Sequence, residues 1–540
     1  MALGGSVEPS SLAHPETAFG PDVLAVRNAL LSLSDRAGAV GLARALVAAG
    51  ATLWATEGTA GELARAGLAV RAVGELVGQG AWLGGRVKTL HPGLLGGVLA
   101  RRDVPTDLAD LATRGVPPID LVAVALYPFE SLPGNVSREE ALETIDVGGV
   151  TLLRAAAKNL RDVAVLSSPG QYEDATRSLA ERGGIPFALR RAWARAAFER
   201  TASYDAAIAS WFAERGEEAG VSSGEPPETW LLAFRRARRL RYGENPHQDA
   251  ALYLAPRDHG IAGGEALLEG RELSYNNLLD LDAAVGLVHE FAGPACAVVK
   301  HNEPAGVGLG ENALEAFERA FAADSLSAFG GVVALNRDLD EDTARALARP
   351  FLEVVAAPEF TAGALSALSA KKNLRLVRLG ATRRPAARWQ ARPLGRALLV
   401  QAVRADAPGL GVSVVTRRHP TPDEMEALLF AWTVAAHARS NAIVFARVDR
   451  TLGIGSGQTS RIDAVEVALL KARRCGHDLA GAVLASDGFF PFADWVEAVR
   501  EAGLAAVIQP GGSVRDRESI EACDAAGLAM VFTGRRQFRH

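Results

Sequence analysis

A lysine and a histidine stand side by side at Lys300 and His301, where a short apolar run ends. The run 296–299 has the pattern of a buried strand, and the stretch 302–306 contains a Pro and a Gly, so the pair is expected at a strand end. A histidine exchanges a proton near neutral pH, and a neighbouring ammonium stabilises negative charge that develops beside it. The pair indicates acid–base chemistry only in combination with other residues, because most histidines are structural or exposed.

A second group of reactive side chains is the basic loop of Arg86, Lys88 and Thr89, which follows Gly84 and Gly85. Two positive charges and a hydroxyl within one turn suit a phosphate or another anion, and the glycines let the backbone approach a ligand closely. A solvated basic loop is the other interpretation of this pattern.

Lysine itself is rare, with only six lysines among the 58 Lys and Arg residues. Arg supplies a solvated charge equally well but does not give up its proton, so each retained Lys is a functional candidate. Lys158 lies in an Ala-rich helical pattern, twelve residues after Asp146. Tyr127 follows the apolar run 121–126 and is expected at another strand end.

The elements that must position these residues alternate between short apolar runs and helical patterns over 26–221. Strands are predicted over 29–33 and 51–55, and helices over 39–49 and 60–66. This alternation is typical of an open parallel sheet, whose ligands bind at the carboxyl ends of the strands.

Two hydroxyl residues fall at these predicted strand ends. Ser34 follows the first strand, and Thr59 lies in the polar turn after the second. Their hydroxyls and the amides of a helix N-terminus suit the same anion as the basic loop. We therefore expect them to join that loop around one phosphate.

The chain divides at a polar stretch over 214–229 that contains Gly and Pro and is predicted to be a linker. Residues 1–25 are expected to form a flexible tail, 26–221 the first domain and 230–540 the second. The second region is long for one core, and we expect two subdomains that divide near 390–405. Its sequence shows no strong internal repeat.

Composition excludes several classes of function. A formal net charge of -5 over 540 residues gives no basic surface of the kind that nucleic acid requires. Cys296, Cys475 and Cys523 are far apart, so neither a disulfide framework nor a structural zinc site is indicated, and a reducing cytoplasm fits best. No long apolar run occurs, so neither a signal peptide nor a membrane span is expected.

Polar turns are also frequent in the second region. Arg241 and Tyr242 lie in a dense polar stretch over 240–248, and both side chains suit a phosphate. Further turns follow at 327–331, 440–441, 453–458 and 460–461. None has the GxGxxG or GxxxxGK[ST] spacing, so dinucleotide and P-loop sites are disfavoured.

Nine of these stretches, taken in order, resemble one family. They are SDRAG at 34–38, GRVKTLHP at 85–92, LYPF at 126–129, IDVGGVTLLRAAAKN at 145–159, LRYGENPHQ at 240–248, VVKHNEPAG at 298–306, SAFGG at 327–331, SNAIV at 440–444 and GQTSR at 457–461. The chain thereby resembles the bifunctional purine biosynthesis proteins from Val26 to His540. In that family one chain carries phosphoribosylaminoimidazolecarboxamide (AICAR) formyltransferase and inosinate (IMP) cyclohydrolase.

The resemblance implies an α/β fold with a methylglyoxal-synthase-like parallel-sheet domain, followed by a formyltransferase region of two cytidine-deaminase-like subdomains. The implied reactions are the last two steps of de novo IMP synthesis. The formyl group of 10-formyltetrahydrofolate passes to the 5-amino group of AICAR, and the product, FAICAR, closes to IMP with loss of water.

The resemblance also implies a role for each matching residue. His301 would be the general base on the AICAR amine, Lys300 would stabilise charge on the formyl oxygen, and Asn441 would act beside them. Ring closure would use a group of four residues, called here the ring-closure group, with Lys158 as proton donor and acceptor. Its members are Lys88, Tyr127, Asp146 and Lys158.

The remaining matches are expected to bind substrates. Those in the first domain are Ser34, Thr59, Arg86 and Thr89. Those in the second domain are Arg241, Tyr242, Gly330, Glu353, Arg461, Ile462, Phe489, Asp494, Ser513 and Arg536.

The implied ligands are small molecules, with 10-formyltetrahydrofolate as a cosubstrate. No transition metal, nucleic acid or membrane is expected, and a monovalent cation is left open. The resemblance further implies a homodimer whose formyltransferase sites are built across the interface.

Two alternatives stay open because Arg36, Glu57 and Ala125 replace residues that are common in the family. The first is a formyltransferase whose N-terminal domain only binds a nucleotide. The second is a regulatory nucleotide sensor, since methylglyoxal-synthase-like domains can serve as allosteric sites. A sensor needs the phosphate loop but not the distal Lys158, so retention of the whole ring-closure group favours the bifunctional enzyme.

Overall fold

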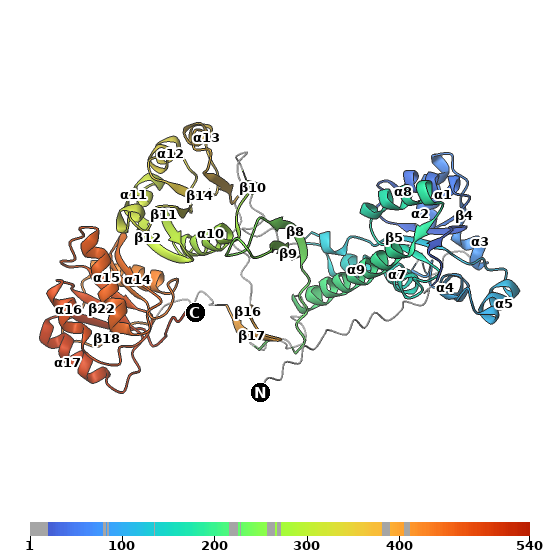
Figure 1. The fold of residues 1–540 in the computed structure, drawn as a ribbon. Coiled ribbons are helices and arrows are strands. Elements are labelled where there is room, and N and C mark those ends of the chain that lie inside the picture. Colours follow the sequence, from blue (N-terminus) through green and yellow to red (C-terminus); the bar gives the residue numbers. More distant parts are fainter. Residues whose placement is uncertain are drawn as a thin grey trace, which may run out of the picture. The chain divides into compact units, whose positions relative to one another are not determined.

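The computed structural model describes residues 20–78, 83, 86–133, 135–214, 225–226, 228–255, 265–266, 272–380, 389–403 and 411–540. They divide into two compact units, Met1–Phe234 and Arg235–His540 (Figure 1). Each unit is described by itself.

The first unit is built on a five-stranded sheet in the order β4-β3-β2-β5-β6, and every neighbouring pair is parallel. Its strands are apolar almost throughout because both faces of the sheet are covered. They are β2 (Asn28–Leu33), β3 (Thr52–Ala55), β4 (Arg71–Ala72), β5 (Leu121–Ala125) and β6 (Ala164–Leu166). The expected parallel sheet is confirmed.

The helices of the first unit pack in two groups, one on each face of this sheet (Figure 1). Helix α1 packs on α8, while α7 packs on β5, α4 and the long helix α9. The helices are α1 (Ala39–Ala48), α2 (Glu57–Arg65), α3 (Val73–Val77), α4 (Pro92–Leu99), α5 (Pro105–Thr113), α6 (Arg138–Glu143), α7 (Gly148–Lys158), α8 (Tyr172–Arg182) and α9 (Phe187–Glu214), with short 3-10 turns at Phe129–Ser131 and Pro169–Gln171. Helix α2 begins three residues earlier than predicted, at Glu57, whose carboxylate suits a helix N-terminus.

The described part of the N-terminal segment begins at residue 20 and is bonded to the first unit. Strand β1 (Val23–Leu24) pairs with β7 (Ile185–Pro186), and the side chain of Arg190 donates to the backbone oxygen of Pro21 at 2.6 Å. The expected tail over 1–25 is therefore wrong for its last residues, because these backbone and side-chain bonds join them to the first unit. Residues 1–19, and most of the expected linker at 215–224 and 227, lie outside the described residues.

The second unit contains a twelve-stranded sheet in the order β10-β15-β14-β13-β11-β12-β20-β19-β21-β22-β23-β18. Its two halves repeat one pattern, in which a helix precedes a hairpin and helices then alternate with three parallel strands. The first half contains β10 (Glu265–Ala266), β11 (Ala295–Lys300), β12 (Glu303–Leu309), β13 (Gly331–Leu335), β14 (Leu352–Ala357) and β15 (Arg375–Arg378). The second half contains β18 (Ser413–Val414), β19 (Ile443–Arg447), β20 (Arg450–Gly455), β21 (Val483–Ser486), β22 (Ala506–Gln509) and β23 (Ala529–Phe532).

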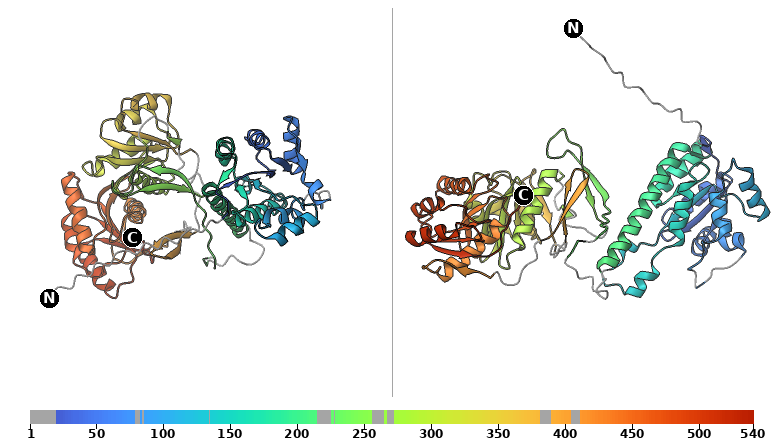
Figure 2. Two further views of the ribbon diagram at one scale, coloured as in Figure 1. Left: turned by 45° about the vertical axis from the view of Figure 1, so that its right-hand side comes forward. Right: turned by 90° about the horizontal axis from the view of Figure 1, so that it is seen from below.

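Helices cover both faces of this sheet (Figure 2). One face packs against α10 (Tyr275–Val288) and α14 (Pro422–Ala435), which share one apolar core across both halves. The other face packs against α11 (Ala313–Ala323), α12 (Glu341–Leu347) and α13 (Ala362–Leu368) in the first half, and α15 (Arg461–Arg474), α16 (Trp495–Glu501) and α17 (Asp516–Ala526) in the second. The side chains of β11 therefore alternate between the two faces of the sheet. Ala297 and Val299 lie in the core shared with α10 and α14, whereas Cys296 and Val298 lie in the core on the opposite face.

Two hairpins complete the second unit, β8 (Arg235–Leu240) with β9 (Ala250–Leu254) and β16 (Trp389–Leu394) with β17 (Ala397–Ala402). The second hairpin lies between the two halves in sequence, within the stretch where a division was expected.

One edge of the twelve-stranded sheet collects most of the predicted site residues, and we call it the hairpin edge. It carries the turn between β11 and β12, the amino ends of β13, β14 and β15, and the carboxyl ends of β20, β21, β22 and β23. This follows from the registers, because β11 is antiparallel to β12 and β13, and β12 is antiparallel to β20.

Candidate active sites

In the first unit, Ser34 and Thr59 lie at the carboxyl ends of the strands, as the sequence predicts. The Ser34 hydroxyl donates to the backbone oxygen of Leu126 at 2.7 Å, which joins the ends of β2 and β5. Thr59 is buried, and its hydroxyl accepts the N–H of Leu33 at 3.1 Å. Both hydroxyls thus fix the strand ends around the site.

Arg36 is a functional candidate that the residue pattern did not single out. A Cβ placed on Gly58 would lie 2.7 Å from Arg36 Nη2, so the guanidinium packs over the first turn of α2. It also forms an ion pair with Glu62 at 3.5 Å. A positive charge at a helix N-terminus favours the binding of an anion there. The carboxylate of Glu57 is exposed on the same turn.

Three members of the ring-closure group lie together. Asp146 accepts the N–H of Gly149 at 2.6 Å and the backbone N–H of Tyr127, and the ammonium of Lys88 acts on it electrostatically. Burial raises the pKa of Asp146, although the two N–H groups and Lys88 act in the opposite direction. Burial also raises the pKa of Tyr204 to about 12, and its phenol accepts the N–H of Asp146 at 2.9 Å. No motif in the sequence singled out Tyr204.

The rest of the basic loop is tied to the same region. Thr89 is buried against Gly148, where an added Cβ would lie 2.3 Å from its hydroxyl, so it contacts the N-terminus of α7. Arg86 is exposed and pairs with Glu143, with 3.3 Å between Nε and Oε2. Gly84 and Gly85 lie outside the described residues.

Lys158 lies away from the other three. Asp146 precedes the first turn of α7 and Lys158 is its last residue, so the helix separates them by about 15 Å at 1.5 Å per residue. The expectation that Lys158 lies beside Asp146 is therefore wrong within one chain, because the whole length of α7 intervenes. The Lys158 side chain is exposed at the opposite end of the helix.

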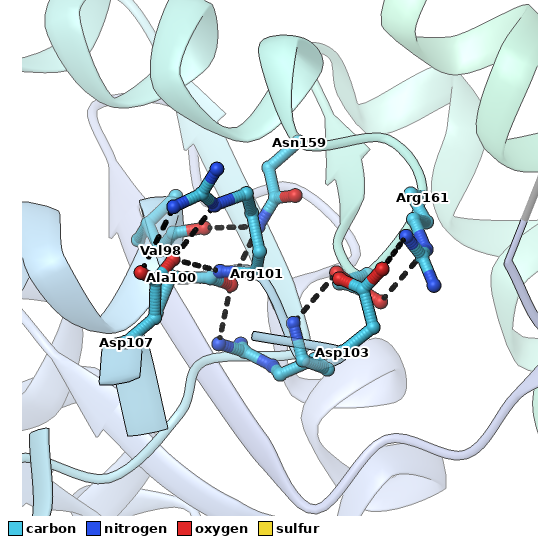
Figure 3. A network of polar contacts seen from close by, with 9 residues as sticks. Val98, Ala100, Arg101, Asp103, Asp107, Asn159 and Arg161 are labelled. Atoms are coloured by element: carbon cyan, nitrogen blue, oxygen red, sulfur yellow. Dashed lines mark hydrogen bonds and ion pairs between the residues drawn. The ribbon is translucent and has the colours of Figure 1, made fainter. Parts of the chain in front are cut away.

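A polar network fixes that far end of α7 (Figure 3). Asn159 donates to the backbone oxygens of Val98 at 2.8 Å and Ala100 at 3.1 Å. Arg161 pairs there with Asp103. The network fixes the backbone at the helix end that carries Lys158.

In the second unit, Lys300 and His301 occupy the hairpin edge. His301 has φ 56° and Asn302 has φ 62°, the left-handed conformation that a two-residue hairpin turn requires. Lys300 Nζ donates to the backbone oxygen of Phe329 at 2.6 Å. This contact fixes the ammonium beside the His301 turn.

Asp280 anchors this turn from helix α10. Its carboxylate accepts the N–H groups of Asn302 at 2.5 Å and of His301 at 3.3 Å. Burial raises the pKa of Asp280 against the effect of these two N–H groups. Sequence reasoning missed Asp280, although an acidic residue within the largely apolar helix α10 was a usable signal.

A cavity of about 190 Å³ opens next to this turn. Arg241 and Tyr242 line it, with 2.9 Å between Arg241 Nη2 and the Tyr242 hydroxyl. Glu353 also lines it and accepts from Asn277 at 2.7 Å. The complete lining is Arg241, Tyr242, Ser274, Phe351, Glu353, Asn373 and Arg375.

Gly330 contacts Phe351, one of the residues that line the cavity. It has φ 72°, and its N–H donates to the backbone oxygen of Phe351 at 2.8 Å. The rings of Phe329 and Phe351 lie 5.1 Å apart and are both about half exposed. The cavity therefore combines cationic side chains with the ring of Phe351, which packs against Phe329.

Asn441 lies on the same edge, before β19. Arg461 Nη2 donates to its Oδ1 at 2.7 Å, and Nη1 lies 2.6 Å from Oδ1 of the buried Asp487. Glu303, which follows the His301 turn, accepts the N–H of Arg439 at 3.1 Å. This bond joins the two halves of the sheet near the site.

The other predicted residues follow along the second half of the hairpin edge. Ile462 lies in the first turn of α15, Phe489 is 41% exposed after β21, and Asp494 precedes α16. Ser513 follows β22, and the guanidinium of Arg536 stacks 4.8 Å from the Phe538 ring after β23.

In the described ranges, no group of three or more His, Cys, Asp or Glu side chains is arranged to hold a metal ion. None of the helices in the described part of the chain combines the length and the apolarity that crossing a membrane requires.

The sequence of this chain matches two protein-family models and several known proteins. The family model described as AICARFT/IMPCHase bienzyme matches residues 156–471, and the MGS-like domain model matches residues 38–151. The bifunctional purine biosynthesis protein PurH of Anaeromyxobacter sp. (strain K) is 48% identical over 534 residues, which cover 95% of this chain and 100% of the relative. The protein of the same name from Desulfitobacterium hafniense (strain DSM 10664 / DCB-2) is 46% identical over 521 residues, with the same coverage.

A solved structure titled "Crystal structure of ForH" is 39% identical and covers 35% of this chain and 98% of its own, with a TM-score of 0.32. The sequence relatives cover almost the whole chain, and the bienzyme model alone spans more than half of it. By these matches, this chain belongs to the AICARFT/IMPCHase bienzyme family.

Proposed function

We propose that this chain catalyses both reactions of its family, formyl transfer from 10-formyltetrahydrofolate to AICAR and ring closure of FAICAR to IMP. The main support is that each unit has its own group of ionisable residues at one edge of its sheet. The first unit holds Lys88 close to Asp146, and the second holds Lys300 beside His301.

In the second unit, His301 acts as general base on the AICAR amine. That amine is conjugated with the imidazole and its carboxamide, so it is a weak nucleophile and gains from proton removal as it attacks the formyl carbon. Lys300 stabilises the negative charge on the formyl oxygen. Its bond to Phe329 supports this role because it orients the ammonium before substrate binds. The bond between the formyl carbon and N10 of the folate then breaks, and the proton that His301 took from the amine passes to N10 as tetrahydrofolate leaves.

The cavity beside the turn holds the ribonucleotide. Arg241 and Arg375 bring two guanidinium groups to it, which suits a phosphate, and Tyr242 adds a hydroxyl. Glu353 supplies an acceptor for ribose or amine groups. Gly330 lets the backbone approach this ligand closely.

The spread of the remaining residues supports a homodimer. From Glu353 on β14 to Arg536 after β23, the hairpin edge crosses eight strand spacings, about 38 Å at 4.8 Å each. This is far longer than a ribonucleotide, so one molecule cannot contact both residues in one chain. We therefore place Asn441, Arg461, Ile462, Phe489, Asp494, Ser513 and Arg536 around substrates shared with a second copy.

In the first unit, Lys88, Tyr127 and Asp146 surround the reacting end of FAICAR. The carboxamide nitrogen attacks the formyl carbon, and a proton must reach the departing water. Ser34, Thr59, Arg86 and Thr89 bind the nucleotide around this group.

Lys158 takes part in ring closure from a second copy. Helix α7 separates it from Asp146 in its own chain, and its side chain is exposed at the helix end, where another subunit can approach it. This proposal retains the proton donor and acceptor that the family resemblance implies. It agrees with a homodimeric enzyme.

Separate assays of the two reactions test the proposed function. The alternative is a formyltransferase whose first unit binds nucleotide without reacting, and it is favoured only if ring closure is absent. We further propose a cytoplasmic enzyme with a cyclohydrolase domain over 26–221 and a formyltransferase domain over 230–540.

A further inference from the structure

Both polar atoms of the Asn441 side chain are engaged. Its Oδ1 accepts from Arg461 Nη2 at 2.7 Å, and its Nδ2 donates to the backbone oxygen of Gln458 at 3.0 Å. The amide therefore has one orientation, because a flipped amide would face a donor with a donor. One N–H of Nδ2 is left to donate to a ligand.

Arg461 reaches Asn441 from a buried position, with only 8% of the residue exposed. A buried guanidinium needs a counter-charge, and the fully buried Asp487 provides it, with 2.6 Å from Oδ1 to Arg461 Nη1. The hydroxyl of Ser486 also accepts from Nη1 at 2.7 Å. Since the guanidinium is planar and rigid, fixing Nη1 also fixes the direction of Nη2 towards Asn441.

Asp487 holds the backbone around Asn441 as well. Its Oδ1 accepts the N–H of Ala442 at 3.0 Å, and its own N–H donates to the oxygen of Ala442 at 3.2 Å. Its backbone oxygen accepts the N–H of Gln537 at 2.8 Å. One buried residue thus ties the strand end that carries Asn441 to the segment that carries Arg536.

We infer that Asp487 is a positioning residue for formyl transfer, which acts through Arg461 to hold the Asn441 amide with one N–H directed to an oxygen of the substrate. The inference rests on the proposed function of the second unit. It also adds a positioning role for Arg461, whose two terminal nitrogens both bond to protein side chains.

The test uses the full-length enzyme with Asp487→Asn, which keeps the shape of the side chain and removes its charge. Formyl transfer is followed by tetrahydrofolate release, and ring closure of FAICAR in the same preparation reports the intact first unit. We expect kcat for formyl transfer to fall by about 10- to 100-fold while KM for AICAR changes by less than about threefold. Glu521→Gln is the matched control, because Glu521 pairs with Arg517 on the exposed face of α17 and should leave kcat unchanged.

A double-mutant cycle separates positioning from general stability. In an Asn441→Ala background, adding Asp487→Asn should lower kcat by no more than about twofold, because the group that Asp487 positions is already gone. A further loss of about 10-fold or more in that background, or an unchanged kcat in the single variant, would overturn the inference. A rise in KM for AICAR at constant kcat would also overturn it, because it would show that Asp487 affects the binding of AICAR rather than the orientation of the Asn441 amide.

If Asp487→Asn does not fold, as judged by circular dichroism, Arg461→Lys decides the question. It retains a positive charge near Asp487 but cannot bond to Asp487 and Asn441 together. If Arg461→Lys lowers kcat by the same factor in the wild-type background but not in the Asn441→Ala background, the positioning of Asn441 is supported. An unchanged kcat in Arg461→Lys rejects it. A wild-type enzyme that releases no tetrahydrofolate refutes the proposed function itself, whereas an active wild type with unaffected variants refutes only the role of Asp487.

Discussion

Asp146 and Lys158 lie at opposite ends of helix α7, about 15 Å apart along its axis. Asp146 contacts the group that contains Lys88 and Tyr127, whereas Lys158 is exposed next to the network of Asn159. Within one chain, helix α7 therefore holds Lys158 apart from the other three members of the ring-closure group. Our proposal is that Lys158 of one copy reaches the site of the other.

Mixing two inactive variants tests this arrangement. Lys88→Ala and Lys158→Ala should each lose most ring closure, and Lys158→Arg should lose it too because Arg keeps its proton. If Lys158 acts on the site of the other copy, each mixed dimer regains one intact site, and re-equilibrated equal mixtures reach about a quarter of wild-type activity.

No recovery on mixing would mean that both lysines act within one chain. Full ring closure in Lys158→Arg alone would remove Lys158 from the mechanism. Size-exclusion chromatography of the mixture checks that the copies associate.

Replacing the proposed general base should affect one reaction only. His301→Ala should lower formyl transfer by at least about 100-fold, because the AICAR amine then loses its proton acceptor. Ring closure of added FAICAR should stay within about twofold, since the first unit has its own sheet and core. His419→Ala, at an exposed histidine of the same unit, is the control. Loss of both activities in His301→Ala would show that the two sites are not independent.

Asp280 should matter because of the turn that it holds. In Asp280→Asn, the amide accepts only one of the two N–H groups from His301 and Asn302 and turns a donor towards the other. We expect kcat for formyl transfer to fall by about 10- to 100-fold. Asp282→Asn, at an exposed position on the same helix, should leave it unchanged. Equal effects of the two substitutions would contradict a role for the turn.

The raised pKa of Asp146 predicts how stability varies with pH. The pKa of Asp146 is higher in the folded protein than in the unfolded chain. Between these two pKa values the folded state binds more protons than the unfolded state, so the free energy of unfolding falls as the pH rises through that interval. Asp146→Asn cannot ionise, so its stability relative to the wild type should be greater at pH 8 than at pH 4.

Urea unfolding at both pH values, followed by circular dichroism, measures this difference. Asp110→Asn, which removes an exposed carboxylate from α5, is the comparison and should show no such gain at pH 8. A gain that is equal at both pH values would argue against burial as the cause.

Much of the local structure could be predicted from the sequence. The parallel strands at 29–33 and 51–55 were foreseeable because they are short, apolar and followed by polar turns. The strand-end rule also placed Ser34, Thr59 and the Lys300 pair correctly at sheet edges, since side chains after a strand must lie there.

What could not be predicted depends on long-range packing. The sequence of the second unit shows no strong repeat because its two halves share a pattern of elements rather than residues, so only the family resemblance implied two like subdomains. Asp487 and Tyr204 were missed because their partners, Arg461 and the backbone of Asp146, are distant in sequence. By contrast, the separation of Lys158 from Asp146 was predictable from the length of the helical pattern between them.

The most direct measurement is a pair of assays on the purified full-length protein. One follows tetrahydrofolate release from AICAR and 10-formyltetrahydrofolate, and the other follows IMP formation from FAICAR. The account predicts both activities in one preparation. Formyl transfer without ring closure would contradict the catalytic role of the first unit, and the absence of both would contradict the proposed function altogether.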